Sequence, residues 1–288
     1  MAINFFTDEN NYLDEKKIIK KNFEFKVYKN RALVNALEQI FNGKCAYCES
    51  RFAHVTSYDI EHYRPKLKIS NEGELPLRPG YFWLAGEWSN LLISCPDCNR
   101  SRGHAVPGSK QKRTLGKLSQ FPLSDETQRV RDHTADIASE EPYRLLLDPC
   151  KDQPEKYLTF DINGFVRART DFNNLPNRRG SVSINVFALQ RQALVHERLR
   201  VITDFQYDLY TLRMVVKDLA GMDSNNVLRE DLEEKRLQFR IVKERLRKRF
   251  EAGAPYLGML REHVRVNLSV GSYKDLYDAG IDLSILVS

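Results

Sequence analysis

Cys45-Ala46-Tyr47-Cys48 and Cys95-Pro96-Asp97-Cys98 are two short Cys-x-x-Cys segments, and the residues that they enclose decide the fold of this chain. Between them lies Tyr58-Asp59-Ile60-Glu61-His62-Tyr63-Arg64-Pro65-Lys66, and Asn99 follows the last cysteine directly. Each segment presents two thiolates to one metal, so two segments complete a tetrahedral zinc shell. We therefore predict a structural zinc ion held by Cys45, Cys48, Cys95 and Cys98.

The sequence around the cysteines predicts two strands followed by a helix. Residues 52–62 are rich in β-branched and aromatic residues, and Leu91 to Ser94 form a second short apolar run, as strands do. Pro96 is suited to the first turn of a helix, and that helix carries Cys98 and Asn99. The order strand, loop, strand, helix is that of a ββα-metal unit.

Helical spacing marks further elements on both sides of this unit. Residues 30–42 place apolar residues every three or four positions before Gly43, which predicts a helix with a glycine cap. Residues 100–117 are basic and irregular, so we expect a solvated loop there. Its place directly after Asn99 favours contact with phosphates.

The second half of the chain predicts a hairpin and then helices. Asn163-Gly164 lies between two alternating stretches, which is a strong hairpin pattern. Apolar residues at helical spacing over 199–219 and 228–250 predict two long amphipathic helices. We predict an α+β fold with an N-terminal helix and nuclease-like core in residues 1–124, a hairpin linker in 125–180, and an α-helical domain in 181–288 that docks a partner.

The composition narrows the class of protein. The chain has 288 residues, 42% hydrophobic residues and a net charge of +6, which fits a globular protein and suits a polyanionic partner. Four of the five cysteines fall into close pairs, which indicates metal binding in a reducing compartment. No signal peptide or membrane span is evident, so we expect a cytoplasmic protein. Cys150 is expected to be a small buried residue.

The remaining polar residues suit metal-assisted hydrolysis of a phosphodiester. His62 can deprotonate water near neutral pH. Glu61 and Asn99, with Asp59 as a further ligand, offer the oxygen atoms that Mg²⁺ or Mn²⁺ prefers, and Asn90 can brace the loop that orients His62. The residues expected to hold substrate phosphates are Arg64, Lys66, Arg100 and Arg102.

Two other interpretations stay open at this point. A zinc module that binds nucleic acid without cutting it explains the cysteines, but it leaves Glu61, His62 and Asn99 without a role. A redox function for a Cys-x-x-Cys pair is weaker, because there are two pairs and no βαβ context. An assay for cleavage separates the first alternative from a nuclease.

These residues together resemble the HNH endonuclease superfamily: Cys-x-x-Cys, Glu61-His62-x-x-Pro65, Asn90-Leu91-Leu92 and Cys-x-x-Cys-Asn99. The longer run from Asp59 to Lys66 is similar to the PtuB family, the HNH subunits of Septu-type anti-phage systems that also occur with certain retrons. Further similarity lies in Leu146-Leu147-Asp148-Pro149, Leu158-Thr159-Phe160-Asp161 and Val186-Phe187-Ala188-Leu189. The third HNH position is Asn99 rather than His, and Glu61 stands where Asp is more usual.

The resemblance implies roles and partners that composition and spacing do not. It makes His62 the general base, assigns the catalytic metal to Glu61 and Asn99, and gives Asn90 the middle position of the motif. It also implies a PtuA-like ATPase of ABC type as partner, with retron components as an alternative. DNA is the favoured substrate. Two other interpretations are a nuclease that cleaves RNA, including tRNA in a retron-type system, and a free-standing HNH nuclease.

Overall fold

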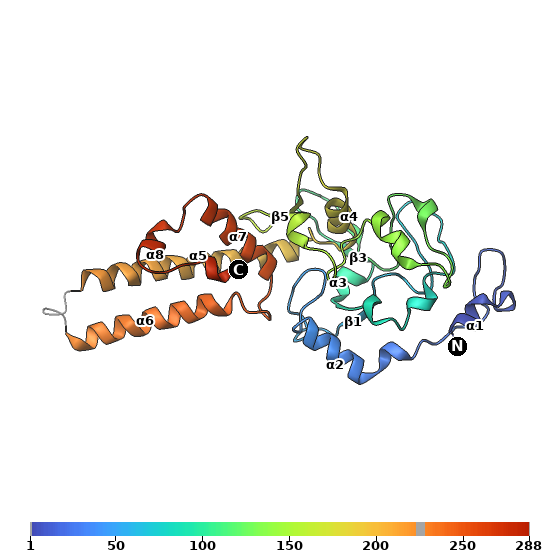
Figure 1. The fold of residues 1–288 in the computed structure, drawn as a ribbon, viewed down its shortest axis with the longest axis horizontal. Helices are drawn as coiled ribbons and strands as arrows, with labels where there is room; N and C mark the ends of the chain where they lie inside the picture. Colours follow the sequence, from blue (N-terminus) through green and yellow to red (C-terminus); the bar gives the residue numbers. More distant parts are fainter. Residues whose placement is uncertain (1, 223–227, 288) are drawn as a thin grey trace. The chain divides into compact units, whose positions relative to one another are not determined.

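The computed structural model describes residues 2–222 and 228–287, and the predicted order of strand, strand and helix is present in it (Figure 1). Strand β1 (Asp59–His62) pairs antiparallel with β2 (Leu91–Ser94), with Glu61 opposite Leu92 and His62 opposite Leu91. Helix α3 (Pro96–Asn99) follows directly. Strand β1 is shorter than predicted, because residues 52–56 satisfy their amides in a local turn in which Val55 and Thr56 donate to the Phe52 carbonyl.

The helix predicted before the first cysteine pair is confirmed. Helix α2 covers Arg31–Ile40, and the side chain of Asn30 accepts a hydrogen bond from the Ala32 amide, 2.8 Å away, as an N-cap. Gly43 follows the helix with φ +66°, and its amide donates to the Glu38 carbonyl. A glycine in this conformation closes a helix without steric cost.

The basic stretch after α3 is more ordered than expected. Strand β3 (Arg102–His104) pairs antiparallel with β4 (Arg113–Leu115), where we expected an irregular loop. Both strands are largely exposed, so they lack the alternation of apolar and polar residues by which strands are recognised. Gly108, at φ +79°, lies in the turn between them.

The chain forms two compact units. The first contains the residues up to Leu158 together with Arg167–Gln192, and the second contains Thr159–Val166 together with Ala193–Ser288. The predicted hairpin, strands β5 (Leu158–Phe160) and β6 (Val166–Ala168), lies where the chain passes from one unit to the other and back. The predicted domain limits at residues 124 and 180 concern parts that fold separately, and they stay predictions.

The first unit also holds helices α1 (Ala2–Thr7) and α4 (Arg178–Val186). Near α1, the aromatic residues Phe6, Tyr12, Phe25 and Phe82 form a buried cluster. Short 3-10 turns complete the connections at Glu9–Asn11, Val27–Lys29, Phe82–Leu84, Trp88–Asn90, Glu126–Gln128, Ile137–Tyr143 and Pro154–Lys156. Cys150 is exposed, so the prediction of a buried small residue was wrong. It lies at the turn that follows the buried run Leu145–Leu147, not within it.

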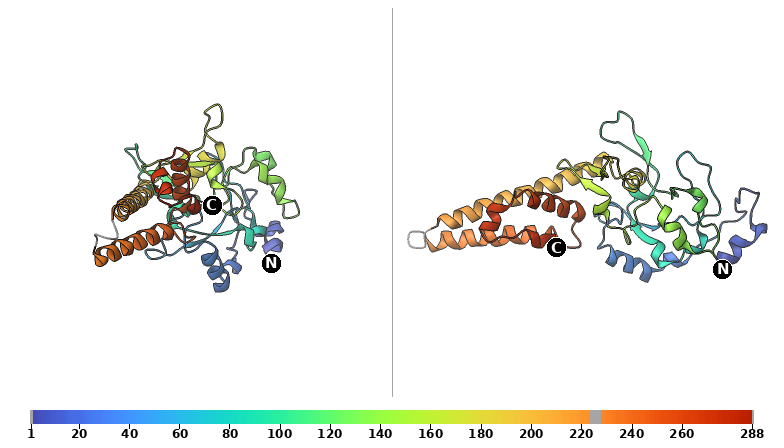
Figure 2. Two further views of the ribbon diagram at one scale, coloured as in Figure 1. Left: turned by 60° about the vertical axis from the view of Figure 1, so that its left-hand side comes forward. Right: turned by 45° about the horizontal axis from the view of Figure 1, so that its top comes forward.

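The second unit is helical, as predicted. Helices α5 (Gln192–Gly221) and α6 (Arg229–Lys248) run side by side in opposite directions (Figures 1 and 2), and α7 (Leu257–Ser269), α8 (Lys274–Asp278) and a 3-10 turn (Ser284–Leu286) complete it. The fully buried carboxylate of Asp208 on α5 lies 2.5 Å from Arg245 and 2.6 Å from Arg249. Within the described residues, none of the helices combines the length and apolar character that crossing a membrane requires.

Candidate metal centre and adjoining polar site

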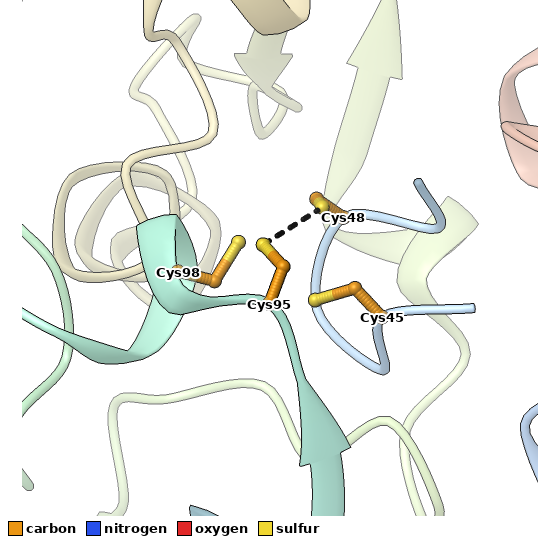
Figure 3. Close-up of side chains that lie close together, drawn as sticks. All are labelled: Cys45, Cys48, Cys95 and Cys98. Atoms are coloured by element: carbon orange, nitrogen blue, oxygen red, sulfur yellow. Dashed lines mark hydrogen bonds between the residues drawn. The ribbon is translucent and has the colours of Figure 1, made fainter. Parts of the chain in front are cut away.

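The four cysteines of the two pairs converge on one point, and Figure 3 shows their side chains directed toward it. Cys45 and Cys48 come from one loop, Cys95 from the end of β2 and Cys98 from α3. All four are buried, and their sulfur atoms lie within 4.8 Å of one another. Among the residues that the structure describes, these four cysteines are the one group of His, Cys, Asp or Glu side chains that lie close enough together to share a metal ion.

The sulfur spacing fits zinc. A tetrahedral site with Zn–S bonds of about 2.3 Å places its sulfurs about 3.8 Å apart. Cys48 Sγ and Cys95 Sγ are 3.8 Å apart. The donor set is therefore of the right kind and the right size for a structural zinc ion, as the cysteine spacing predicted.

Backbone hydrogen bonds hold the two cysteine loops against each other. The Ala46 amide donates to the Ile93 carbonyl at 2.9 Å, which ties the first loop to β2. The Cys98 and Asn99 amides both donate to the Cys95 carbonyl at 3.1 Å and form the tight first turn of α3. The site is thus built on β2, which pairs with the strand that carries Glu61 and His62, and on α3, which carries Asn99.

His62 lies at the end of β1 and is almost fully buried. Its Nε2 is 3.1 Å from the Ala85 carbonyl, and its Nδ1 is 3.2 Å from Lys66 Nζ. A carbonyl can only accept, so Nε2 carries the ring proton and Nδ1 the lone pair. Burial and the nearby Lys66 charge lower the pKa of His62 to about 3. The imidazole is therefore neutral at pH 7, and its Nδ1 lone pair accepts a hydrogen bond from the Lys66 ammonium.

The surroundings of His62 fix its ring. Tyr28 contacts it edge to face, with ring centroids 4.9 Å apart. Lys66 Nζ lies 4.4 Å from the centre of the same Tyr28 ring. Burial lowers the pKa of Lys66 to about 8, so this lysine still carries most of its charge at pH 7. No pattern in the sequence pointed to Tyr28.

Asn90 joins the loop after β1 to the segment that holds the imidazole. Its Oδ1 accepts from the Arg64 amide at 2.7 Å, and its Nδ2 donates to the carbonyls of Arg64 and Leu84, both at 3.1 Å. Leu84 directly precedes Ala85, whose carbonyl fixes the His62 ring. This is the geometry that the predicted bracing role requires.

Glu61 forms an ion pair with Lys117, a residue that the sequence did not mark as part of the site. The side chain of Lys117 is completely buried, and its Nζ lies 2.5 Å from Glu61 Oε1 and donates to the His62 carbonyl at 3.0 Å. Burial raises the pKa of Glu61, and the charge of Lys117 opposes that shift. Lys117 is one of several cations in the basic stretch after α3, and nothing in its local sequence separates it from the others.

Asp59, Asn99 and Arg100 form a second group on α3 and the start of β1. Asn99 Nδ2 donates to Asp59 Oδ2 at 3.0 Å. Arg100 donates hydrogen bonds of 2.6 and 2.9 Å to the two oxygens of the same carboxylate. Asp59 and Glu61 lie two residues apart on β1, so their carboxylates share one face of the strand, and His62 is its last residue.

The other predicted phosphate-binding residues differ in their access to solvent. Arg64 is only 5% exposed and pairs with Glu140 at 2.9 Å and Glu141 at 2.8 Å. Its guanidinium is thus part of the core. Arg102 is exposed on β3 and pairs with Asp97 at 3.1 Å. Arg100, Arg102 and Lys66 remain the candidates that can meet a polyanion.

Sequence comparison connects this arrangement with a known group of proteins. The chain is 38% identical over 223 residues to the Septu protein PtuB of Bacillus mycoides strain KBAB4, a match that covers 77% of this chain and 66% of that protein. This chain is similar to PtuB. A PtuB protein of Bacillus thuringiensis is 36% identical over 69 residues, which are 24% of this chain and 22% of that protein.

A second Septu protein also contains similar sequence. The PtuA protein of B. mycoides strain KBAB4 is 28% identical over 179 residues, covering 62% of this chain and 22% of that protein. A region like this chain thus makes up about a fifth of that PtuA, while the longer PtuB match spans just under two thirds of PtuB. A scan against family models found no match.

Proposed function

We propose that this chain is a metal-dependent HNH endonuclease that hydrolyses phosphodiester bonds of nucleic acid, with DNA as the favoured substrate. In this proposal it acts as a component of a Septu-type anti-phage defence system. The observation that carries the proposal is the state of His62. It is a buried, neutral imidazole whose Nδ1 keeps its lone pair while Nε2 is fixed by the Ala85 carbonyl. The four-cysteine site beyond the other end of the β1–β2 pair and the similarity to PtuB support the same interpretation.

In this proposal His62 Nδ1 removes a proton from the attacking water. The ring is oriented and neutral at pH 7, and withdrawal of the Lys66 charge removes one of the causes that lower its pKa, so its basicity rises toward that of a general base. Asn90 holds both ends of the surrounding loop, so the ring keeps its direction when substrate binds. Attack by water gives products with 5′-phosphate and 3′-hydroxyl ends.

Lys66 has two roles that follow from its position. Its ammonium donates to Nδ1 when no substrate is present, and so it covers the lone pair that the reaction requires. A phosphate oxygen is a stronger acceptor for an ammonium than a neutral imidazole. We infer that an arriving phosphate draws Lys66 away and uncovers the base.

The oxygen atoms of Glu61, Asp59 and Asn99 are the donors assigned to Mg²⁺ or Mn²⁺. Their chemistry suits a hard cation, although Lys117 and Arg100 now hold two of them. A divalent ion bound here would offset the charge that develops on the phosphate oxygens during hydrolysis. Its binding requires these carboxylates to exchange a protein cation for the metal.

The test of this function is cleavage by the purified chain. Plasmid DNA, single-stranded DNA and total RNA are each incubated with Mg²⁺, Mn²⁺ or EDTA. We expect cutting of plasmid DNA that needs the divalent ion and leaves 5′-phosphates that a ligase accepts. Cleavage of RNA alone would favour the retron-type reading. Binding without products under every ion would favour a non-catalytic zinc module.

We propose further that the partner is a PtuA-like ATPase and that the helical second unit takes part in docking. The support is that one PtuA protein carries a region similar to this chain on the same polypeptide. We infer from this that the two kinds of polypeptide also act together where they are separate.

Co-expression with a PtuA protein is expected to give a complex that survives gel filtration. Deleting residues 228–288, which removes α6 to α8, should abolish this complex while zinc remains bound, since the cysteines lie in the first unit. Retention of the complex by the shortened chain would place docking elsewhere. Failure of the full chain to associate would favour a free-standing nuclease.

A further inference from the structure

Arg191 points its guanidinium at the cysteine cluster from the segment that connects α4 to α5. Nη1 lies 3.4 Å from Cys98 Sγ, and Nη2 lies 3.5 Å from Cys48 Sγ and 3.7 Å from Cys95 Sγ. The residue is only 5% exposed. Three of the four sulfurs therefore accept an N–H bond from one buried cation.

The remaining contacts of Arg191 do not account for its burial. Nη1 also donates to the Ala188 carbonyl at 3.1 Å, and Nε lies 3.9 Å from a carboxylate oxygen of the partly exposed Asp97. A buried guanidinium needs a close anion to offset the loss of hydration. Neutral thiols would leave only the distant Asp97 for this purpose, whereas metal-bound thiolates supply negative charge at hydrogen-bond distance.

Charge balance gives the guanidinium a definite effect on the metal. Four thiolates around one Zn²⁺ carry a net charge of two minus, and this charge is buried here. An arginine within hydrogen-bond distance cancels half of it. Bonds from N–H groups also withdraw electron density from sulfur, which makes the thiolates weaker bases and slows their protonation and release.

The segment around Arg191 is fixed to the same cysteine loop by a second contact. The Phe187 ring stacks on Tyr47, which lies between the two cysteines of the first pair, with centroids 3.9 Å apart. The Gln192 amide donates to the Ala105 carbonyl at 2.8 Å. Residues 187–192 thus lie against the cysteine loops through a ring stack, a backbone hydrogen bond and the three contacts with sulfur.

We infer that Arg191 is a positioning residue of the zinc site: it retains the metal by neutralising part of the thiolate charge, and through it zinc holds residues 187–192, the segment that leads into α5, in place. The inference depends on the cysteines binding zinc and is independent of the nuclease proposal.

The test compares three variants of the full chain. Arg191→Met keeps an unbranched apolar stem and removes the charge. Arg191→Lys keeps the charge but replaces the planar fork of five N–H donors by a single ammonium with three. Arg200→Met removes an exposed arginine of α5 as a control. Zinc transfer to a coloured chelator is followed in time. We expect Arg191→Met to lose zinc roughly 10 to 100-fold faster than wild type, Arg191→Lys to lie between them, and Arg200→Met to match wild type.

A second measurement separates the proposed role from simple packing. With Co²⁺ in place of zinc, the thiolate-to-cobalt absorption reports electron density on sulfur, and loss of the N–H bonds should move it to longer wavelength in both Arg191 variants. Hydrogen exchange at residues 187–192 should rise in the same variants. If Arg191→Met does not fold, Arg191→Lys carries both readouts. Zinc release and cobalt absorption equal to wild type in the Arg191 variants would overturn the inference.

Discussion

Replacing Cys48 with serine should remove the bound zinc and destabilise the first unit by several kcal/mol. A structural zinc ion in a small domain contributes about 10 kcal/mol or more of apparent binding free energy, and that energy is available to folding. Cys48 lies 3.8 Å from Cys95 at the centre of the cluster, so its loss opens the shell. For a unit of this size we expect Tm to fall by about 10 °C or more.

The exposed Cys150 provides a matched control. Metal analysis and thermal unfolding are measured for wild type, Cys48→Ser and Cys150→Ser. Wild type and Cys150→Ser should each hold about one zinc per chain and unfold at the same temperature. A Cys48→Ser protein that is fully folded without zinc would show that the cluster is not a structural metal site.

Replacing His62 with alanine should lower the rate of cleavage by about 10² to 10⁴-fold, the usual contribution of a general base. The ring lies at the end of β1 with its Nδ1 lone pair available once Lys66 is withdrawn. No other histidine of the described residues contacts Ala85 or Lys66 in this way. The comparison is made under single-turnover conditions with the substrate that the wild-type chain cuts.

Two checks keep this result interpretable. His54→Ala removes an exposed histidine from the loop before β1 and should cut like wild type. Zinc content and the unfolding temperature of His62→Ala are measured as well, because His62 is buried and its loss can disturb folding. Cleavage at the wild-type rate by a folded His62→Ala protein would remove HNH chemistry from consideration.

Local sequence determined the cysteine cluster and its two strands and helix. Leu91–Ser94 forms β2 with the predicted limits, and Pro96 begins α3 as its fixed φ favours. The Cys-x-x-Cys spacing brings two thiolates together within a few residues of chain, so the metal site can be predicted without knowledge of the fold. The β3–β4 pair was missed because exposed strands of three residues give almost no periodic pattern.

The contacts of the polar site depend on residues that are distant in sequence. Glu61 meets Lys117, and Arg64 meets Glu140, and neither pairing can be read from spacing along the chain. Arg64 was predicted to bind phosphate because it follows His62 closely, but ion pairs with Glu140 and Glu141 hold its guanidinium in the core. Arg191 was missed for the same reason, since 93 residues separate it from Cys98.

The helical second unit is assembled from two separate stretches of chain, and this limits how it can be inherited. Gly164 in the short stretch lies so close to α5 that a Cβ there would be 2.5 Å from the Val195 carbonyl oxygen. Thr159 donates to Glu262 of α7 at 2.6 Å. A gene segment that begins at residue 181 or 193 encodes all of the long helices without these partners. A transferred gene segment must therefore begin at or before residue 159 to carry residues 159–166 along with the helices, and it then brings Arg167–Gln192 of the first unit with it.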